Sequence, residues 1–285
     1  MIILGHKINP VLKEHILRIG KLPLDEFYLG DTIKDFISIT KRVLAMRGEV
    51  LVYNTSITNL VLLLLLRLIG KCRITYHLHD PLPHSGWKNP IIFAVNLFSV
   101  RLSHNVGVFS QHLAIQTEKY YGKRPRVLSH GLNDFNLLNY DYSDRLGVFG
   151  RNMPYKNFSE ILKLFEGEKL VVVGKGYNQI DGIDTIKYYS GFVPNDVYYS
   201  IMYSVRAVIV LHKVVSYSGV ISDSMKLGKY IIGNSLVEEH VRGYERFIHF
   251  RDYRNIDLCS LESNILDRSV FGWDQYRKEL SELWS

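Results

Sequence analysis

The sequence predicts the α/β fold class, with two Rossmann-like domains. Short apolar runs alternate with longer amphipathic stretches, a pattern typical of βαβ units and parallel sheets. The polar segment 133–136 (Asn-Asp-Phe-Asn) interrupts this alternation and carries turn-forming residues, as a linker would. A chain of 285 residues is long enough for two modest domains. We therefore expect an N-terminal domain over residues 1–134 and a C-terminal domain over residues 135–270.

The same alternation predicts the individual elements. In the N-terminal half, the expected strands are Met1–Leu4, Val50–Asn54, Arg73–Leu78, Val106–Phe109 and Arg126–Ser129, and the expected helices are Pro10–Ile19, Thr32–Met46, Ile57–Leu68, Pro90–Ser103 and Gln111–Tyr121. In the C-terminal half, the expected strands are Leu146–Phe149, Leu170–Val173, Thr185–Tyr188, Ala207–Leu211 and Tyr230–Ile232, and the expected helices are Asn157–Phe165, Asn195–Tyr203 and Gly219–Lys226. Residues 271–285 contain a segment of helical spacing, Trp273 to Trp284, which suits a terminal helix packed back across the domain boundary.

Cysteine usage and the start of the chain point to the cytoplasm. Cys72 and Cys259 are far apart and match neither a disulfide framework nor a zinc spacing, so we expect a reducing compartment with both thiols buried. The first residues lack the charged start, apolar run and cleavage site of a signal peptide. The most apolar segment, Leu60–Ile69, is about half of the ~20 residues that a membrane span needs and contains Arg67, so it predicts a buried helix.

The net charge of +7 and the pI near 9.2 indicate attraction to polyanions, which include nucleic acid, anionic lipid and phosphorylated substrates. The sequence contains no zinc finger, no RNP-type aromatic signature and no basic run of five or more residues. Nucleic acid is therefore not expected as a partner.

The segment Gly150-Arg151-Asn-Met-Pro-Tyr-Lys156 directly follows an expected strand. A glycine at a strand end permits a tight turn, and two cations beside the next helix N-terminus suit a diphosphate. The alternative is a solvated loop with two surface cations. Downstream, the expected strand at 170–173 runs into Gly174 and Gly176, as expected where a backbone approaches a ligand or turns sharply. The third glycine of a dinucleotide fingerprint is missing, so no nicotinamide or flavin cofactor is expected.

A third segment, Ser216–Ile232, contains the start of an expected helix. Ser218, Gly219 and Val220 would open this helix, with its free N–H groups facing phosphate, and Asp223 would accept hydrogen bonds from ribose hydroxyls one turn further in. The alternative is an ordinary helix with a Ser N-cap and a solvated Asp223.

The N-terminal half carries three histidines and an aspartate within eight residues, in the segment Tyr76-His-Leu-His79-Asp80-Pro-Leu-Pro-His84. The prolines hold the loop extended, so imidazole and carboxylate groups are available for proton transfer. Zinc binding and a purely structural loop are the alternatives, and the cluster lacks a regular pair of ligand spacings.

The order Gly-Arg-x-x-x-Tyr-Lys, Val-Val-Gly-Lys-Gly and Ser-Gly-Val-x-x-Asp-x-Met resembles the C-terminal domain of GT-B glycosyltransferases of the group-1, family 4-like type. The segments Phe109-Ser-Gln-His-Leu and Leu128-Ser-His130-Gly131 resemble family turns in the other half. The resemblance implies two Rossmann-like domains facing across a cleft. It implies that Arg151 and Lys156 grip the donor diphosphate, with Asp223 on the ribose, and that Gly150, Gly174, Ser218, Gly219 and Val220 belong to the donor site.

One departure concerns the Glu-x7-Glu pair of many relatives. If Asp223 takes the second place, the first falls at Val215, where there is no carboxylate.

The His79–His84 segment resembles the acceptor-side His-Asp-x-x-x-His loop, which implies catalytic or sugar-contacting roles for Asp80, His79 and His84. A retaining enzyme would need no dedicated base, and an inverting one would use Asp80 or, second, His79.

The resemblance therefore implies a hexosyltransferase that moves a sugar from a UDP- or GDP-linked donor to a glycan or lipid-linked glycan, as in bacterial surface polysaccharide assembly. No cofactor and no obligatory metal are expected, since the sequence has no Asp-x-Asp. Peripheral contact with an anionic membrane, at the inner face of the plasma membrane, is compatible with the charge. A non-catalytic nucleotide-sugar-binding protein and a nucleotide-sugar epimerase of similar fold are the alternatives.

Overall fold

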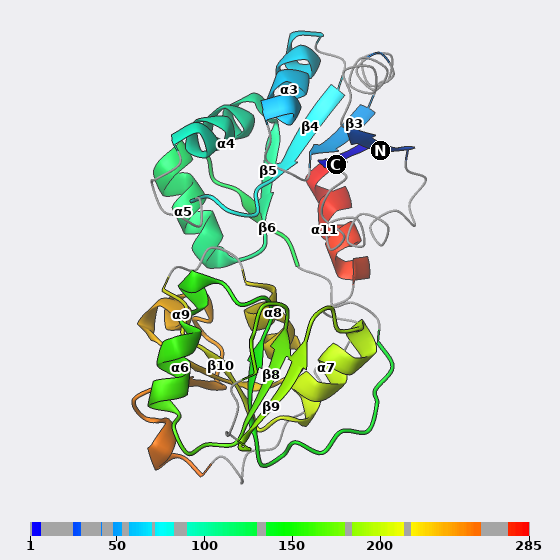
Figure 1. Ribbon diagram of the computed structural model, residues 1–285. Coiled ribbons are helices and arrows are strands. Elements are labelled where there is room, and N and C mark those ends of the chain that lie inside the picture. Colours follow the sequence, from blue (N-terminus) through cyan, green and yellow to red (C-terminus); the bar gives the residue numbers. More distant parts are fainter. Residues whose placement is uncertain are drawn as a thin grey trace. The chain divides into compact units, whose positions relative to one another are not determined.

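The chain forms two compact units, which we describe from a computed structural model (Figure 1). Unit 1 comprises Met1–His130 and Trp273–Ser285, and unit 2 comprises Gly131–Gly272. The structure describes residues 2–6, 25–29, 41, 48–52, 57–69, 72–82, 90–129, 135–179, 184–213, 218–257 and 273–284. The expected helices Pro10–Ile19 and Thr32–Met46 lie outside these residues, apart from Lys41.

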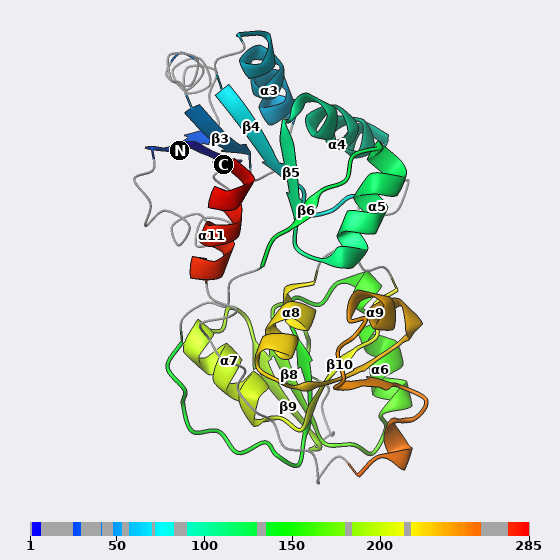
Figure 2. The same ribbon diagram turned by 180° about the vertical axis from the view of Figure 1, so that it is seen from behind.

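Unit 1 contains a six-stranded parallel sheet in the order β2-β1-β3-β4-β5-β6. Its strands are β1 (Ile2–His6), β2 (Asp25–Leu29), β3 (Gly48–Val52), β4 (Cys72–His77), β5 (Asn105–Val108) and β6 (Arg126–Val127). The helices α3 (Ile57–Ile69), α4 (Pro90–Leu102) and α5 (Gln111–Tyr121) lie together along one side of this sheet (Figures 1 and 2). Parallel neighbours joined through helices are the arrangement that the alternating pattern predicts.

Local signals explain why α5 has the bounds expected from the sequence. The Ser110 side chain caps the helix by accepting a hydrogen bond from the Leu113 N–H at 3.2 Å. Gly122 ends it in the left-handed region, with φ 68°, and its N–H donates to the Glu118 carbonyl. Strand β2 was not expected, because Asp25 and Glu26 open it with two acids and leave only three residues to carry a strand pattern.

Unit 2 contains a second six-stranded parallel sheet in the order β12-β11-β10-β7-β8-β9. The strands are β7 (Leu146–Phe149), β8 (Leu170–Gly174), β9 (Ile186–Ser190), β10 (Ala207–Val210), β11 (Tyr230–Gly233) and β12 (Phe247–His249). The helices are η2 (Pro154–Lys156), α6 (Phe158–Leu164), α7 (Asn195–Ser204), α8 (Gly219–Lys226), α9 (Ser235–His240) and η3 (Tyr253–Asn255). Within unit 2 the strands run 3-2-1-4-5-6, the order of a doubly wound nucleotide-binding sheet.

The sequence pattern missed α9 and β12 in unit 2. Helix α9 has six residues and β12 has three, which is too short for a helical or alternating period to emerge. Asn234 nevertheless caps α9, since its Oδ1 accepts a hydrogen bond from the Val237 N–H at 3.1 Å.

Helix α11 (Trp273–Trp284) belongs to unit 1 and has the bounds expected from its spacing. Glu279 accepts hydrogen bonds from the Ser129 N–H at 2.6 Å and the Ser129 hydroxyl at 2.8 Å, just beyond β6. Near the end of α11, the Leu283 carbonyl accepts a hydrogen bond from Asn105 Nδ2 at 3.1 Å. The helix therefore runs along the last two strands of the unit 1 sheet.

Successive residues of a strand point to opposite faces of its sheet, and β4 shows which helices cover which face. The Tyr76 hydroxyl donates to Asn96 of α4 at 3.1 Å. The neighbouring His77 ring contacts Tyr276 of α11, with ring centroids 5.9 Å apart. Helices α4 and α11 thus cover opposite faces of the unit 1 sheet.

Two further observations concern the described residues. Cys72 is buried and forms no disulfide, while Cys259 lies outside the part of the chain that the structure describes. Among the described helices, none has both the length and the apolar character that crossing a bilayer requires.

Replacing Tyr276 with Ala should lower the free energy of unfolding of unit 1 by about 3 kcal/mol or more, because the fully buried ring fills space against His77 and Phe109. Tyr276→Phe keeps the ring and should cost about 1 kcal/mol or less. All three tryptophans fall within the ranges of unit 1, so urea denaturation followed by tryptophan fluorescence measures this unit. Equal midpoints for the Ala variant and the wild type would contradict this packing role.

Candidate active site

The unit 2 sheet reverses its direction of winding between β7 and β10, which are hydrogen-bonded neighbours. In open α/β sheets, ligands bind beyond the carboxyl ends of the strands at such a switch point. The Gly150–Lys156 segment follows β7 directly. Helix α8 is the first described element after β10. The topology therefore brings together at one edge two segments that are more than sixty residues apart in sequence.

Gly150 and Gly174 bring the turns after β7 and β8 into direct backbone contact. Gly150 has φ 87° and Gly174 has φ 143°, conformations that L side chains rarely adopt. A Cβ at position 174 would lie 2.6 Å from the Gly150 carbonyl carbon. Hydrogen bonds from the Gly150 N–H to the Val173 carbonyl and from the Asn152 N–H to the Lys175 carbonyl, both 2.8 Å, join the two turns. Glycine is thus required at position 174 for the turns to meet, and the positive φ at position 150 favours glycine there as well.

Lys156 is buried beneath the Gly150 turn. Its Nζ donates a hydrogen bond to the Phe149 carbonyl at 3.0 Å. A Cβ at position 150 would collide with the Lys156 ammonium and would lie 3.3 Å from Val220 at the start of α8. Burial lowers the pKa of Lys156 to about 8. The β7 turn, the lysine and the first turn of α8 are therefore in contact.

Arg151 is exposed, directly beyond Gly150. No hydrogen bond or ion pair of its side chain occurs within the described part of the chain. At this turn, the side chain of Lys156 is therefore buried and that of Arg151 is exposed to solvent.

Helix α8 begins at Gly219, with Ser218 as its N-cap residue. The Ser218 side chain makes no capping hydrogen bond, so the N–H groups of the first turn are not satisfied by it. A Cβ at position 219 would meet no atom of the described residues within 4 Å, so these residues leave space beside this end of the helix. The arrangement differs from the N-cap alternative, in which the Ser218 oxygen would occupy these donors.

Asp223 is buried one turn into α8, not solvated, with 7% of its surface exposed. Its Oδ1 has no hydrogen-bond partner among the described residues. Burial raises its pKa to about 6, against the opposing effect of the Lys226 charge. A buried carboxylate oxygen without a donor is rare in folded proteins and can accept a hydrogen bond from a ligand hydroxyl.

Sequence reasoning missed the buried side chains of Lys226 and His212 and the half-buried Tyr198 around this site. Lys226 lies near Asp223, and burial lowers its pKa to about 8. Burial and, second, the charge of Asp223 raise the pKa of Tyr198 in α7. His212, just beyond β10, is 4% exposed and packs edge-on against Tyr155, with ring centroids 5.4 Å apart. Its place at the end of a predicted strand was a usable signal for His212.

In unit 1, His79 lies just beyond the end of β4 within an aromatic cluster. Its Nε2 is 3.4 Å from Nδ1 of His77, and its ring is 5.3 Å from the Phe109 ring. His77 in turn contacts both Phe109, at 4.1 Å, and Tyr276. His79 is half-buried and contacts rings from β4 and the end of β5, and both of those rings contact Tyr276 of α11.

Asp80 follows His79 and is also half-buried. The backbone there is anchored from two helices, because the Asp80 carbonyl accepts a hydrogen bond from Asn96 Nδ2 at 3.0 Å and the Pro81 carbonyl accepts one from the Tyr121 hydroxyl. The predicted site residue His84 lies outside the described residues, as do His130, Gly131 and Val215. The described residues contain no group of three or more His, Cys, Asp or Glu side chains suited to hold a metal.

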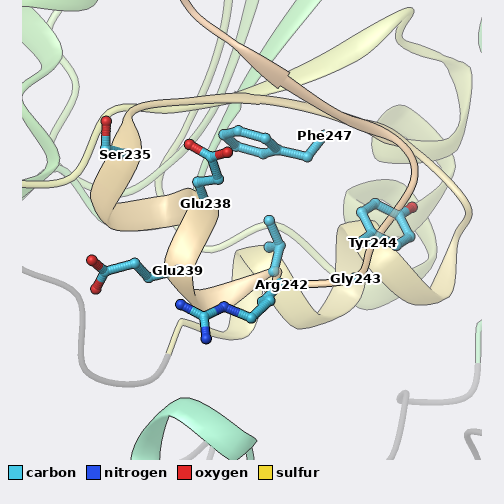
Figure 3. Close-up of a pocket in the computed structure, with 8 residues that line it drawn as sticks. Ser235, Glu238, Glu239, Arg242, Gly243, Tyr244 and Phe247 are labelled. Carbon is cyan, nitrogen blue, oxygen red and sulfur yellow. The ribbon is translucent and has the colours of Figure 1, made fainter.

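A pocket of about 470 Å³ lies elsewhere in unit 2, around α9 and the start of β12 (Figure 3). Glu238 points toward the Phe247 ring in this pocket, and Arg242 and Tyr244 also line it. No predicted donor-site residue lines it. The strand-end position and the buried polar groups therefore locate the candidate site, and this pocket does not.

Comparisons with solved structures show extensive similarity to glycosyltransferases. HepE of Anabaena in complex with UDP and glucose superposes with a TM-score of 0.70 and 16% identity, covering 99% of this chain and 98% of that one. Sucrose-phosphate synthase of Thermosynechococcus elongatus gives a TM-score of 0.73 and 12% identity, covering 99% and 98%. AviGT4, a glycosyltransferase involved in avilamycin A biosynthesis, gives 0.59 and 14%, covering 96% and 86%.

No family model and no curated protein matches the sequence. At such low identities the likeness extends to the fold alone. With two parallel α/β units and these structural neighbours, the chain has the GT-B fold of glycosyltransferases.

Gly174→Ala should destabilise unit 2 by about 2 kcal/mol or more, because the new methyl group would overlap the Gly150 carbonyl at a strained φ. Gly219→Ala is the matched control and should change stability little, since its methyl group enters open space. Unit 2 has no tryptophan, so tryptophan fluorescence cannot report on its unfolding. Hydrogen–deuterium exchange of peptides covering β7 and β8 measures the effect instead. Faster exchange in both variants, or in neither, would contradict the tight contact at Gly174.

Proposed function

We propose that this protein is a glycosyltransferase that moves a hexosyl group from a UDP- or GDP-linked sugar to a glycan or lipid-linked glycan. The observation that carries the proposal is Oδ1 of Asp223, which is buried near the switch point of a doubly wound sheet and has no hydrogen-bond partner among the described residues. The structurally similar protein HepE has been solved in complex with UDP and glucose, which supports UDP as the nucleotide to test first.

In this proposal the donor diphosphate lies over the Gly150 turn. Arg151 reaches it from solvent, Lys156 supplies charge from beneath, and the N–H groups that follow Ser218 at the start of α8 donate to it. These groups stabilise the negative charge that develops on the leaving nucleoside diphosphate. The floor of the proposed donor site is formed by Gly150, Gly174, Gly219 and Val220. Because two cations and a helix terminus can carry that charge, we propose that no metal is obligatory.

Asp223 would hold the ribose in the same proposal. A ribose hydroxyl donating to Oδ1 would satisfy the buried oxygen and favour the ionised carboxylate. Lys226 supplies a positive charge nearby that also favours the ionised form.

The His79–Asp80 turn of unit 1 would supply acceptor-side chemistry, with His84 as a further candidate. In an inverting reaction, Asp80 would take the proton of the acceptor hydroxyl, with His79 as the second candidate base. In a retaining reaction, the same groups would orient the sugar. The packing of His79 on His77 and Phe109 supports a fixed position for the imidazole.

The cellular setting that we propose is the cytoplasm, with peripheral contact at the inner face of an anionic membrane and a role in bacterial surface polysaccharide assembly. The net charge of +7 supports contact with anionic lipid. The partners would then be a nucleotide-sugar and a lipid-linked glycan acceptor, without nucleic acid.

Two variants separate donor binding from turnover. Arg151→Ala should weaken binding of UDP by about tenfold in titration calorimetry, because one charge-assisted contact to phosphate is lost. Asp80→Ala should bind UDP as the wild type does, yet transfer sugar at least ~100-fold more slowly. Lys163→Ala, which removes a lysine from α6 outside the proposed site, is the control for general loss of charge.

Normal transfer by both site variants would refute the assignment of these residues. Absence of binding to any UDP- or GDP-sugar by the wild type would refute the function. Release of an epimerised nucleotide-sugar without an acceptor would instead identify an epimerase.

Binding of UDP-glucose should depend on pH at both ends of the neutral range. Below pH about 6, protonation of Asp223 removes the negative charge that strengthens its hydrogen bond from ribose, and above pH about 8, Lys156 loses its charge, so affinity should fall in both directions. UDP-glucose is the suitable probe because its diphosphate stays ionised throughout. Asp223→Asn should abolish the acidic limb and keep the basic one; an unchanged acidic limb would assign it to another group.

A further inference from the structure

Helix α3 presents a row of aliphatic side chains to solvent. Ile57, Val61, Leu64 and Leu68 follow one another at intervals of four, three and four residues, which places them on one face of the helix. Leu68 is 74% exposed and Ile57 is 61% exposed. The opposite face, with Leu62, Leu63 and Leu66, is buried in unit 1. The helix therefore has a second apolar face beyond the one that its own fold uses.

Helix α4 also presents large apolar side chains to solvent. It packs beside α3 on the same side of the unit 1 sheet (Figures 1 and 2). Ile91, Ile92 and Phe98 are exposed on it, Phe98 by 53%. Large contiguous apolar patches on soluble proteins mark interaction surfaces. We call the exposed side chains Ile57, Val61, Leu64, Leu68, Ile69, Ile91, Ile92 and Phe98 the α3–α4 face.

The charges on these two helices all have one sign. Neither helix contains an aspartate or a glutamate, and each has an arginine in its last turn, Arg67 and Arg101. Both arginines are exposed. Lys123, near the end of α4, donates to the Val100 carbonyl at 3.3 Å and to the Ser103 carbonyl, and so adds a third cation at this end. Two helices that expose apolar side chains, carry cations at their ends and contain no acids complement an anionic lipid surface.

We propose that the α3–α4 face docks unit 1 onto an anionic membrane, with its aliphatic side chains entering the interface and Arg67 and Arg101 contacting lipid phosphates. This inference rests on the peripheral location proposed above and names the surface responsible. It does not depend on the donor chemistry, because all of its residues lie in unit 1 and the proposed donor residues lie in unit 2.

A second copy of the chain is the competing occupant of an apolar face. Two such faces meeting would bring Arg67 and Arg101 of one copy toward the same arginines of the other without an acid on either helix. Like charges in contact are unfavourable, whereas anionic lipid neutralises them. The charge pattern therefore favours the membrane.

Vesicle flotation of the full chain tests the proposal. Wild type should bind vesicles of phosphatidylcholine mixed with phosphatidylglycerol, bind pure phosphatidylcholine more weakly, and dissociate as salt is raised. Leu64→Glu and Leu68→Glu should each lower the partition coefficient about tenfold or more, since a buried aliphatic contact is lost and a negative charge enters the interface. Arg101→Glu should weaken the preference for phosphatidylglycerol about tenfold or more, because a cation near the lipid phosphates is replaced by an anion.

Matched controls are available in unit 2. Leu236→Glu replaces a leucine that is 42% exposed, close to the 46% of Leu64, and Arg242→Glu reverses an exposed arginine. Both should bind vesicles as the wild type does. Binding of UDP-glucose should be unchanged in all five variants, so a failure of the donor proposal is recognised separately.

Equal vesicle binding by wild type and Leu68→Glu would overturn the proposal, as would equal loss in the two controls. Ultracentrifugation without lipid examines the competing occupant. A wild-type dimer that Leu68→Glu converts to a monomer would assign the face to a second copy instead, whereas a wild-type monomer agrees with membrane docking.

Discussion

The close contact between the turns after β7 and β8 is the constraint on which the candidate donor site depends. Gly174 approaches the Gly150 carbonyl so closely that position 174 has no room for a side chain. On its other side, Gly150 faces the ammonium group of Lys156 and lies near Val220 of α8. The Gly150 turn thus lies between the Gly174 backbone, a buried cation and the first turn of α8.

Burying charge near this contact has an energetic cost that a ligand can offset. Burial lowers the pKa of both Lys156 and Lys226 and raises that of Asp223, so in each case the charged form is the disfavoured one. One oxygen of Asp223 has no donor among the described residues. A bound diphosphate and ribose would supply the missing partners, which is the physical reason to regard these groups as a site and not as structural ion pairs.

In unit 1, helix α11 packs on the face of the sheet opposite α3, α4 and α5. Tyr276 of this helix contacts His77 and Phe109, and Glu279 accepts hydrogen bonds from Ser129. His79 rests on the same rings. The position of a candidate catalytic side chain is therefore linked to a helix almost two hundred residues away in sequence.

The sequence by itself determined the elements whose signals are local. Helix α5 has a Ser cap and a left-handed Gly at its ends, and strands such as Leu146–Phe149 are apolar runs that end in glycine, so their bounds were predictable without any neighbour. The same logic identified Arg151 and Lys156 beyond a strand, as well as the start of α8. Short elements such as α9 and β12 escaped because six or three residues carry no readable period.

Only the tertiary structure decided which of these side chains are buried and what they touch. Asp223 on an isolated α8 would be solvated; it is buried because α8 packs within unit 2, near Tyr198 of α7. The His77–Tyr276 contact likewise depends on which face of β4 helix α11 covers. Burial and long-range contact arise from the order of strands in the sheet, a property of the whole chain that no local segment encodes.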